Sequence, residues 1–200
     1  LMHAGDFGQG TSYFSEMNGD IEIDVMNSLG FDVVCLGNHE FDNGTKELAR
    51  RLKNLKAKVV CANYDFENSP LEDVVHPYVI IKKAGMKIGV IGLLTDIRRV
   101  VDKKIAAEFS YIEPADVVNR YAEYLKNEKG CDLVMCLSHL GYEEDKEVAA
   151  LIRNVDVIVG GHTHTLLHKK QEVKDLDGKP VIIVQNWKWG LNVGVLDIKY

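Results

Sequence analysis

The sequence lacks several features that would place a protein in a familiar class. None of its four cysteines forms a C-x-x-C pair, which argues against a zinc knuckle or a thioredoxin-type site. No apolar run approaches the ~18 residues that a membrane-spanning helix needs. Basic residues are outnumbered, with 24 Lys and Arg against 30 Asp and Glu and a net charge of −6. This balance disfavours a partner such as a nucleic-acid duplex, which binds to a basic face.

The remaining composition is that of an ordinary globular domain. Hydrophobic residues make up 46% of the 200 positions and charged residues 27%, so we expect one domain over residues 1–200. Each cysteine lies in an apolar, strand-like run, where a thiol usually behaves as a small core side chain. We therefore expect core thiols rather than disulfides at Cys35, Cys61, Cys131 and Cys136.

Apolar residues recur with the period of a helix in four stretches. These are residues 20–30, 45–56, 113–129 and 143–153. Gly30 is a natural helix end, Thr45 a plausible N-cap, and Pro114 suits a first helical turn. Near-continuous apolar runs between these stretches predict buried strands at residues 31–37, 57–63, 131–138 and 155–161.

Two stretches break this alternation of strand and helix. Residues 76–94 predict a hairpin that turns at Ala84-Gly85, and residues 169–185 predict another that turns at Asp177-Gly178. Residues 190–200 predict one more strand by their alternating pattern. Crossover helices join parallel strands and hairpins join antiparallel strands, so sheets that contain both are mixed. The predicted fold is therefore α/β, a layered sandwich of two mixed β-sheets flanked by helices.

Polar residues that bind metals or move protons follow four of the apolar runs. They are Asp6, then Asn38, His39 and Asp42, then His139, and finally His162 and His164. Ligands of α/β proteins bind beyond the carboxyl ends of the strands, so neighbouring strands would bring these groups together. Imidazoles combined with carboxylate and amide oxygens, without a thiolate, favour a catalytic divalent-metal site. On an extended segment, His162 and His164 would point to the same face.

A structural interpretation competes for each of these residues taken alone. A histidine after a strand is usually an ordinary loop residue, and the clustering at four strand ends is what favours a site. His3, His76 and His168 receive the structural interpretation, although His3 lies close to the expected site. Trp187 and Trp189 are expected to pack in the core or against a hairpin, with a place beside the crevice as the alternative.

Four sequence blocks together resemble a known family. AGDFGQGT, LGNHEFDNG, CLSHLG and VGGHTHT occur in this order, and they resemble the calcineurin-like metallophosphoesterases. More narrowly, they resemble the metal-binding domain of the 5′-nucleotidase/2′,3′-cyclic phosphodiesterase family, and the likeness covers essentially the whole chain. The resemblance implies the calcineurin-like metallophosphatase fold. It also implies hydrolysis of a nucleotide or another phosphoester by a dinuclear metal centre and a metal-activated water.

The resemblance also assigns metal ligands. Asp6 would bridge two divalent ions, which in such enzymes are Mn, Zn, Co or Fe. Asn38, His139 and His162 would complete the shell of one ion, and His164 would bind the other.

The catalytic assignments come from the same likeness. His39 would lie over the phosphate, where it stabilises charge or protonates the departing oxygen, and Asp42 would orient that imidazole. Asn38 and His39 would contact the substrate. Glu40 lies between these candidates and would accept hydrogen bonds from their surroundings.

The chain departs from the family pattern in two ways. The family's Asp-x-His motif, which supplies two further ligands to the second ion, does not occur here. We therefore expect an amino-terminally truncated piece whose second site keeps only Asp6 and His164 and which binds one ion well. The family's nucleoside-recognising carboxy-terminal domain is also absent, so a separate or missing substrate domain is an expected partner.

The family likeness implies a periplasmic or cell-surface location, although no signal segment is visible in the sequence. Two other functions stay open at this point. One is a non-catalytic metal-binding or scaffold domain that acts with a separate partner chain. The other is a phosphatase for non-nucleotide substrates, because a metal core alone does not select the leaving group.

Overall fold

The smaller of two main sheets contains four short strands. The computed structural model describes residues 1–198 and orders these strands β1 (Met2–His3), β2 (Val33–Cys35), β3 (Lys58–Val60) and β5 (Val75–His76). All three pairings are parallel. Their carboxyl ends therefore lie along one edge, and the residues that follow β1 and β2 come together there.

The larger sheet has six strands in the order β11-β12-β10-β9-β7-β6. Their bounds are β6 (Tyr78–Lys83), β7 (Met86–Leu94), β9 (Leu133–His139), β10 (Val157–Gly160), β11 (Gln171–Lys174) and β12 (Pro180–Gln185). The inner pairs are parallel, and both predicted hairpins form antiparallel edges. A two-stranded ladder joins β4 (Tyr64–Asp65) to β8 (Ser110–Tyr111). The predicted α/β architecture with two sheets is confirmed, with a mixed larger sheet and a parallel smaller one.

The helices lie on the outer faces of the two sheets. They are α1 (Ser12–Met17), α2 (Asp20–Leu29), α3 (Thr45–Asn54), α4 (Lys103–Ala106), α5 (Pro114–Glu123) and α6 (Tyr142–Ala150). Short 3₁₀ turns cover His39–Phe41 (η1) and Ile97–Arg99 (η2), and a π-helical turn, Tyr124–Glu128 (η3), extends α5. None of the helices within residues 1–198 has the length and apolar character needed to cross a membrane.

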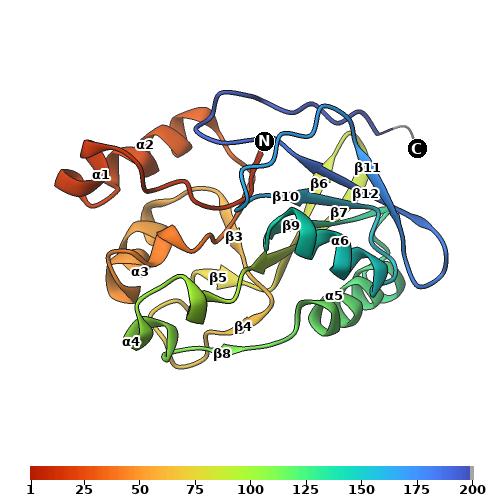
Figure 1. Ribbon diagram of the computed structural model, residues 1–200, viewed down its shortest axis with the longest axis horizontal. Helices are drawn as coiled ribbons and strands as arrows, with labels where there is room; N and C mark the ends of the chain where they lie inside the picture. The colour runs from red at the N-terminus through yellow and green to blue at the C-terminus, as the bar shows by residue number, and fades with distance from the viewer. Residues whose placement is uncertain (199–200) are drawn as a thin grey trace.

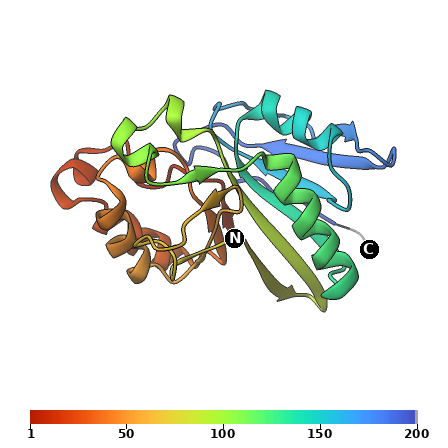
Figure 2. The same ribbon diagram turned by 90° about the horizontal axis from the view of Figure 1, so that it is seen from below.

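Three clusters of buried hydrophobic residues lie between the layers of helices and sheets. Figure 1 shows α1, α2 and α3 on one side of the molecule and α5 and α6 on the other. Val34 of β2 packs in the cluster shared with α2 and α3, whereas Val33 and Cys35 pack in the cluster between the two sheets. A third cluster joins the larger sheet to α5 and α6, and Figure 2 shows α5 running beside the β6–β7 hairpin. Strands buried on both faces account for the unbroken apolar runs.

Several local predictions are confirmed by the structure. Gly30 ends α2 in the left-handed conformation with φ of 72°, and Pro114 occupies the first turn of α5. All four cysteines are free and buried, as expected of core thiols.

Thr45 is not an N-cap, contrary to the prediction. Gly44 holds the cap position with φ of 82°, and Thr45 is already helical with its hydroxyl buried. The cap position needs a positive φ, which few residues other than glycine tolerate. The cap is therefore Gly44, and the first helical residue is Thr45.

The strand predicted for residues 190–200 is also not formed within residues 190–198, and residues 199–200 lie outside the described part. A strand needs a neighbour that accepts its backbone hydrogen bonds. Residues 190–198 take part in no described ladder, and Leu191, Val193 and Val195 are 61%, 77% and 85% exposed. An alternating apolar and polar pattern therefore predicts a segment with one apolar and one polar face, but it does not show whether a neighbouring strand is there to pair with it.

Candidate metal centre

Asp6 lies just beyond the carboxyl end of β1 and faces the end of β2. Its backbone is left-handed, with φ of 58°, a conformation that is uncommon for residues other than glycine. The His39 backbone N–H donates to Asp6 Oδ1 at 3.0 Å. A Cβ at Gly37 would overlap the Asp6 carboxylate, so only glycine lets the two loops approach this closely. The loop geometry thus fixes the carboxylate in one place.

His139 ends β9 and is 1% exposed. Its Nδ1 lies 2.5 Å from the Ala4 carbonyl oxygen, which can only accept, so the ring donates its Nδ1–H there. Nε2 is then directed at Asp6 Oδ2, which is 3.0 Å away. A carbonyl that fixes the ring in this way is typical of histidines that bind metals.

His162 completes a cluster of three candidate ligands. It follows β10 with a left-handed φ of 69°, and its ring centroid lies 5.1 Å from that of His139. One ligand atom each of Asp6, His139 and His162 lies within 4.8 Å of the others. Two ligands of one zinc-type ion are at most about 4.2 Å apart, twice the bond length of about 2.1 Å, so small side-chain movements would bring these atoms onto a single ion.

Two buried polar atoms provide a separate test of whether this cluster fits a metal. Asn38 Oδ1 is buried without a hydrogen-bond partner among the described residues, and the buried His139 Nε2 makes no well-aligned hydrogen bond there although Asp6 Oδ2 lies 3.0 Å away. Buried acceptors are normally satisfied, and an unsatisfied one calls for an explanation such as an ion. Both atoms belong to residues that the motifs predict as ligands, and nitrogen and amide oxygen are suitable donors. The residues present therefore fit a divalent metal.

The charges of the cluster also suit a cation. Burial raises the pKa of the Asp6 carboxyl, but the nearby His139 imidazole and the His39 N–H together lower that pKa more strongly. Burial lowers the pKa of the His139 imidazole, and the same pair with Asp6 outweighs this effect, so the pKa is raised. Burial and the neighbouring His139 lower the pKa of His162. Without an ion, a proton on His139 balances the Asp6 charge.

Metal affinity should therefore rise with pH. A proton on His139 occupies the nitrogen that would bind the ion, so below the raised pKa of His139 each pH unit should weaken Mn²⁺ binding by roughly tenfold. Calorimetric titrations between pH 5.5 and 8 in buffers of different ionisation enthalpy check both the affinity and the number of protons released. An affinity that stays constant over this range, with no proton release, would contradict the assignment of His139 Nε2 as a ligand.

His39 and Asp42 form a second predicted pair beside the cluster. His39 Nδ1 lies 2.9 Å from Asp42 Oδ2, and both side chains are partly exposed. The carboxylate accepts the Nδ1–H and leaves Nε2 free to face a bound molecule. This is the orientation that the sequence predicts for an imidazole that touches a phosphate.

Glu40 organises the backbone around Asp6. Its carboxylate is 0% exposed and accepts four backbone N–H groups. Oε2 accepts from Asp6 at 2.8 Å and Gly37 at 2.6 Å, and Oε1 accepts from Phe7 at 2.9 Å and Gly8 at 3.2 Å. The role expected of Glu40 from the sequence thus has a concrete form: it ties the loop after β1 to the loop after β2.

Replacing Glu40 with glutamine should weaken both the fold and the metal site. One carboxylate oxygen becomes an NH₂ group that faces two N–H donors, and each buried unsatisfied donor costs about 1–3 kcal/mol. We expect a loss of about 2–5 kcal/mol in the free energy of unfolding and a roughly 10–100-fold weaker Mn²⁺ affinity. Urea denaturation and Mn²⁺ titration measure the two effects, with Glu16→Gln on exposed α1 as the matched control. Wild-type values in both measurements would refute this role.

His164 and His3 do not belong to the group of three candidate ligands. His164 is exposed and lies outside the three-ligand group of the described residues. The extended segment expected for His162–His164 is not formed, because both residues are left-handed, with His164 at φ of 53°. His3 packs edge-on against Phe7 and Phe31, which agrees with its structural interpretation.

The two tryptophans are exposed rather than in the core. Trp187 is 41% exposed and Trp189 76%, so the expected place in the core is wrong for both. Both have a left-handed backbone, at 66° and 62°, and their ring centroids lie 6.5 Å apart.

One buried carboxylate near the site was missed by the sequence reasoning. Asp145 of α6 is 1% exposed. The available signal was its position in the helix, because Val148 and Ala149 follow at the i+3 and i+4 positions of the apolar face. A charged residue on an apolar stripe is an anomaly that calls for a separate interpretation.

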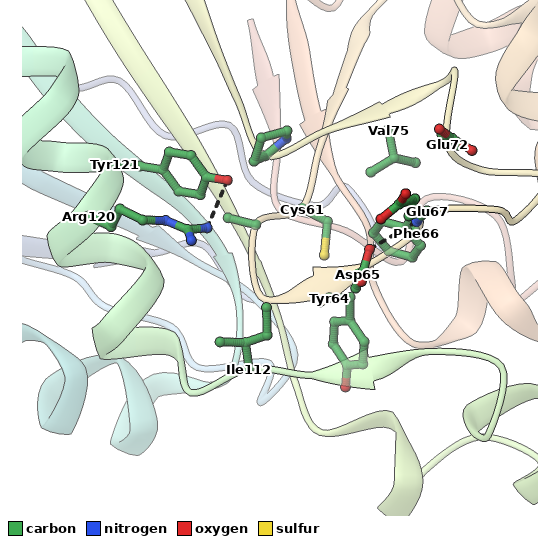
Figure 3. A pocket seen from close by; sticks show the side chains of 12 residues that line it. Cys61, Tyr64, Asp65, Phe66, Glu67, Glu72, Val75, Ile112, Arg120 and Tyr121 are labelled. Atoms are coloured by element: carbon green, nitrogen blue, oxygen red, sulfur yellow. Dashed lines mark hydrogen bonds between the residues drawn. The ribbon is translucent and has the colours of Figure 1, made fainter. Parts of the chain in front are cut away.

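A cavity of about 380 Å³ lies elsewhere in the molecule. Figure 3 shows Arg120 and Tyr121 of α5 on one side and Glu67 and Glu72 on the other, with Tyr121 Oη accepting from Arg120 at 3.0 Å. None of the predicted metal or catalytic residues lines it. The metal cluster is therefore a separate feature of the structure.

Comparison with known proteins places this geometry in a family context. A family model described as calcineurin-like phosphoesterase matches residues 1–166. A probable 5′-nucleotidase of Treponema pallidum (strain Nichols) is 34% identical over 215 residues, which cover 100% of this chain and 36% of that protein. The NAD 5′-nucleotidase of Haemophilus influenzae is 33% identical, again over 100% of this chain and 36% of the relative.

Solved structures give the same result. The 5′-nucleotidase precursor from Thermus thermophilus superposes with a TM-score of 0.89 and 36% identity over 94% of this chain and 39% of that chain. The Haemophilus influenzae NAD nucleotidase superposes with a TM-score of 0.84 and 32% identity over 94% of this chain and 40% of its own. The chain thus spans little more than a third of the length of these curated relatives.

Proposed function

The chain belongs to the calcineurin-like phosphoesterase family, and from this premise we propose that it is a divalent-metal-dependent hydrolase of phosphate esters that acts on nucleotides. The family predicted from the four sequence blocks is thereby confirmed. The observation that carries the proposal is the cluster of Asp6, His139 and His162, together with the buried Asn38 Oδ1, which has no hydrogen-bond partner among the described residues. The nucleotide preference is supported by the relatives, which are described as nucleotidases.

Asp6, Asn38, His139 and His162 would hold the ion. A divalent metal supplies a nucleophile by lowering the pKa of bound water toward about 7, and it polarises the phosphoryl oxygens. Asp6 provides the negative charge of this ligand set, and the Ala4 carbonyl keeps His139 Nε2 directed inward. We extend the proposal to a second ion held by Asp6 and His164.

His39 would act on the leaving group. With Nδ1–H donated to Asp42, the free Nε2 edge of the ring can face a phosphate bound at the metal. A protonated ring stabilises the charge that develops on the phosphoryl group and gives its proton to the departing oxygen. A positioned acid of this kind contributes about 10²–10⁴-fold to a rate.

We also propose a periplasmic or cell-surface location for the protein. The support is the Thermus thermophilus relative, which is described as a precursor.

The direct test is an assay of the metal-loaded protein. The chain is freed of metal with EDTA, loaded with Mn²⁺ or Zn²⁺, and assayed on bis(p-nitrophenyl) phosphate, AMP, 2′,3′-cyclic AMP and a sugar phosphate. We expect metal-dependent release of product, with the nucleotides preferred over the sugar phosphate. No rate above the EDTA-treated sample while the metal is demonstrably bound would refute the proposal and favour a non-catalytic metal-binding domain. Equal rates on the sugar phosphate would refute the nucleotide preference.

A further inference from the structure

Asp145 is a buried carboxylate that the proposed chemistry does not use. It lies in the first turn of α6 and contacts the ends of β9 and β10 at Ser138 and Gly160. It is one of the few charged groups with almost no exposed surface in the described part of the chain. Burial raises its pKa to about 7, and the hydrogen bond from Ser138 opposes this shift. A group that is so costly to bury needs a compensating interaction.

The first contact of Asp145 is with the end of β9. Ser138 Oγ donates to Asp145 Oδ1 at 2.5 Å. The same Ser138 oxygen accepts the backbone N–H of Leu140 at 3.2 Å. The residues on both sides of His139 are therefore tied, through one hydroxyl, to the carboxyl group of Asp145.

The second contact of Asp145 is with the end of β10. A Cβ at Gly160 would overlap Asp145 Oδ2, so this oxygen occupies the space in which any other residue would carry its side chain. Oδ2 itself has no hydrogen-bond partner among the described residues. Gly160 precedes His162 by two positions, so the carboxyl group supports the start of the loop that carries this candidate ligand.

The start of α6 joins the same two loops a second time. The Tyr142 N–H donates to Thr163 Oγ1 at 3.0 Å, next to His162, and the Asp145 N–H donates to the Gly141 carbonyl oxygen at 2.8 Å. The first turn of α6 thus contacts Thr163, the neighbour of His162, and its N-cap Gly141 follows His139 by two positions. A displacement of its buried carboxyl group would be transmitted to both rings.

We propose that Asp145 is a positioning residue of the metal centre, which sets the separation of His139 and His162 through Ser138 on β9 and Gly160 on β10. This inference rests on the proposed metal-binding function. Groups that orient metal ligands from behind typically change metal affinity by about 10–100-fold when they are removed. Asp145 acts only through the ligand-bearing strands, because it touches neither the ion nor the substrate.

The test is a Mn²⁺ titration of the full chain, followed by electron paramagnetic resonance, with thermal unfolding of the metal-free protein measured in parallel. Asp145→Ala should weaken Mn²⁺ affinity by about 10–100-fold. Asp145→Asn has the same shape and an amide oxygen that can accept from Ser138, so it should keep the affinity within about threefold of wild type, a change well below that range. Glu147→Ala, on the exposed face of α6, is the matched control.

Two further variants separate positioning from general stability. Ser138→Ala removes the shared hydroxyl, and its effect on affinity should be much smaller in the Asp145→Ala background, because both changes break the Ser138–Asp145 hydrogen bond and only the Leu140 contact is left to lose. Gly160→Ala places a methyl group where Oδ2 lies, so it should weaken Mn²⁺ binding in the wild-type background and cost less beside Asp145→Ala. Independent, additive effects on affinity would overturn the proposal even if every variant is less stable.

The outcomes distinguish this inference from the proposed function. Unchanged Mn²⁺ affinity in a folded Asp145→Ala protein would overturn the positioning role alone. Mn²⁺ binding that depends on Asp145, in a protein that hydrolyses no phosphoester, would support the positioning role and refute only the hydrolase. A wild-type protein that binds no Mn²⁺ would overturn both.

Discussion

Replacing Asp6 with asparagine is expected to abolish tight metal binding and, with it, hydrolysis. The amide preserves the shape of the side chain but removes the negative charge of the three-ligand group, which otherwise consists of His139 and His162. It also removes the ion pair that holds His139 Nε2 toward the site at 3.0 Å. A direct ligand should matter more than the groups behind it, so we expect Mn²⁺ affinity to fall by more than the roughly 100-fold upper value for outer groups.

The same Asp6 variant should lose activity in proportion to the bound metal. Mn²⁺ titration and the diesterase assay at a fixed, sub-millimolar metal concentration measure the two effects on the same sample. Asp24→Asn, on the exposed surface of α2, provides the matched control. An Asp6→Asn protein that binds Mn²⁺ as tightly as wild type would show that the ion lies elsewhere.

Replacing His39 with glutamine is expected to remove catalysis while leaving the metal in place. His39 is outside the three-ligand group, and its ring is held by Asp42 at 2.9 Å rather than by the cluster. Loss of a positioned acid should lower kcat by about 10²–10⁴-fold, and Mn²⁺ affinity should stay close to that of wild type. Asp42→Asn should have a smaller effect in the same direction, because the ring then loses its orientation but not its proton.

Steady-state kinetics with saturating Mn²⁺ separates kcat from KM for both variants. His168→Gln, an exposed histidine beyond the ligand loop, is the matched control. If His39→Gln retained wild-type kcat, the imidazole would have no role in the chemical step. If it lost Mn²⁺ binding in equal measure, His39 would instead be a ligand.

The fold was largely predictable because its strands are buried on both faces. The runs around Cys35 and Cys136 are apolar without interruption, and such runs are typical of parallel strands between two layers. The convergence of Asp6 and His139 was predicted from the position of both residues at strand ends. Asp6 follows β1 of the smaller sheet and His139 ends β9 of the larger sheet, so their contact depends on how the two sheets pack and not on strand pairing.

The finer geometry of the site was not predictable from spacing. Asp6, His162 and His164 adopt left-handed backbones that sequence patterns normally assign to glycine. Such conformations persist only where surrounding contacts impose them. The four hydrogen bonds of Glu40 and the place of Asp145 beneath Gly160 likewise depend on segments far apart in the chain. Local patterns carry no information about these contacts.

The most direct test of the whole account is a crystal of the chain soaked in Zn²⁺ and measured at the zinc absorption edge. We expect an anomalous difference peak at about 2.0–2.2 Å from an Asp6 carboxylate oxygen, His139 Nε2 and a ring nitrogen of His162, with Asn38 Oδ1 turned toward it. A crystal with strong zinc peaks only at other positions, and none among these side chains, would contradict the account.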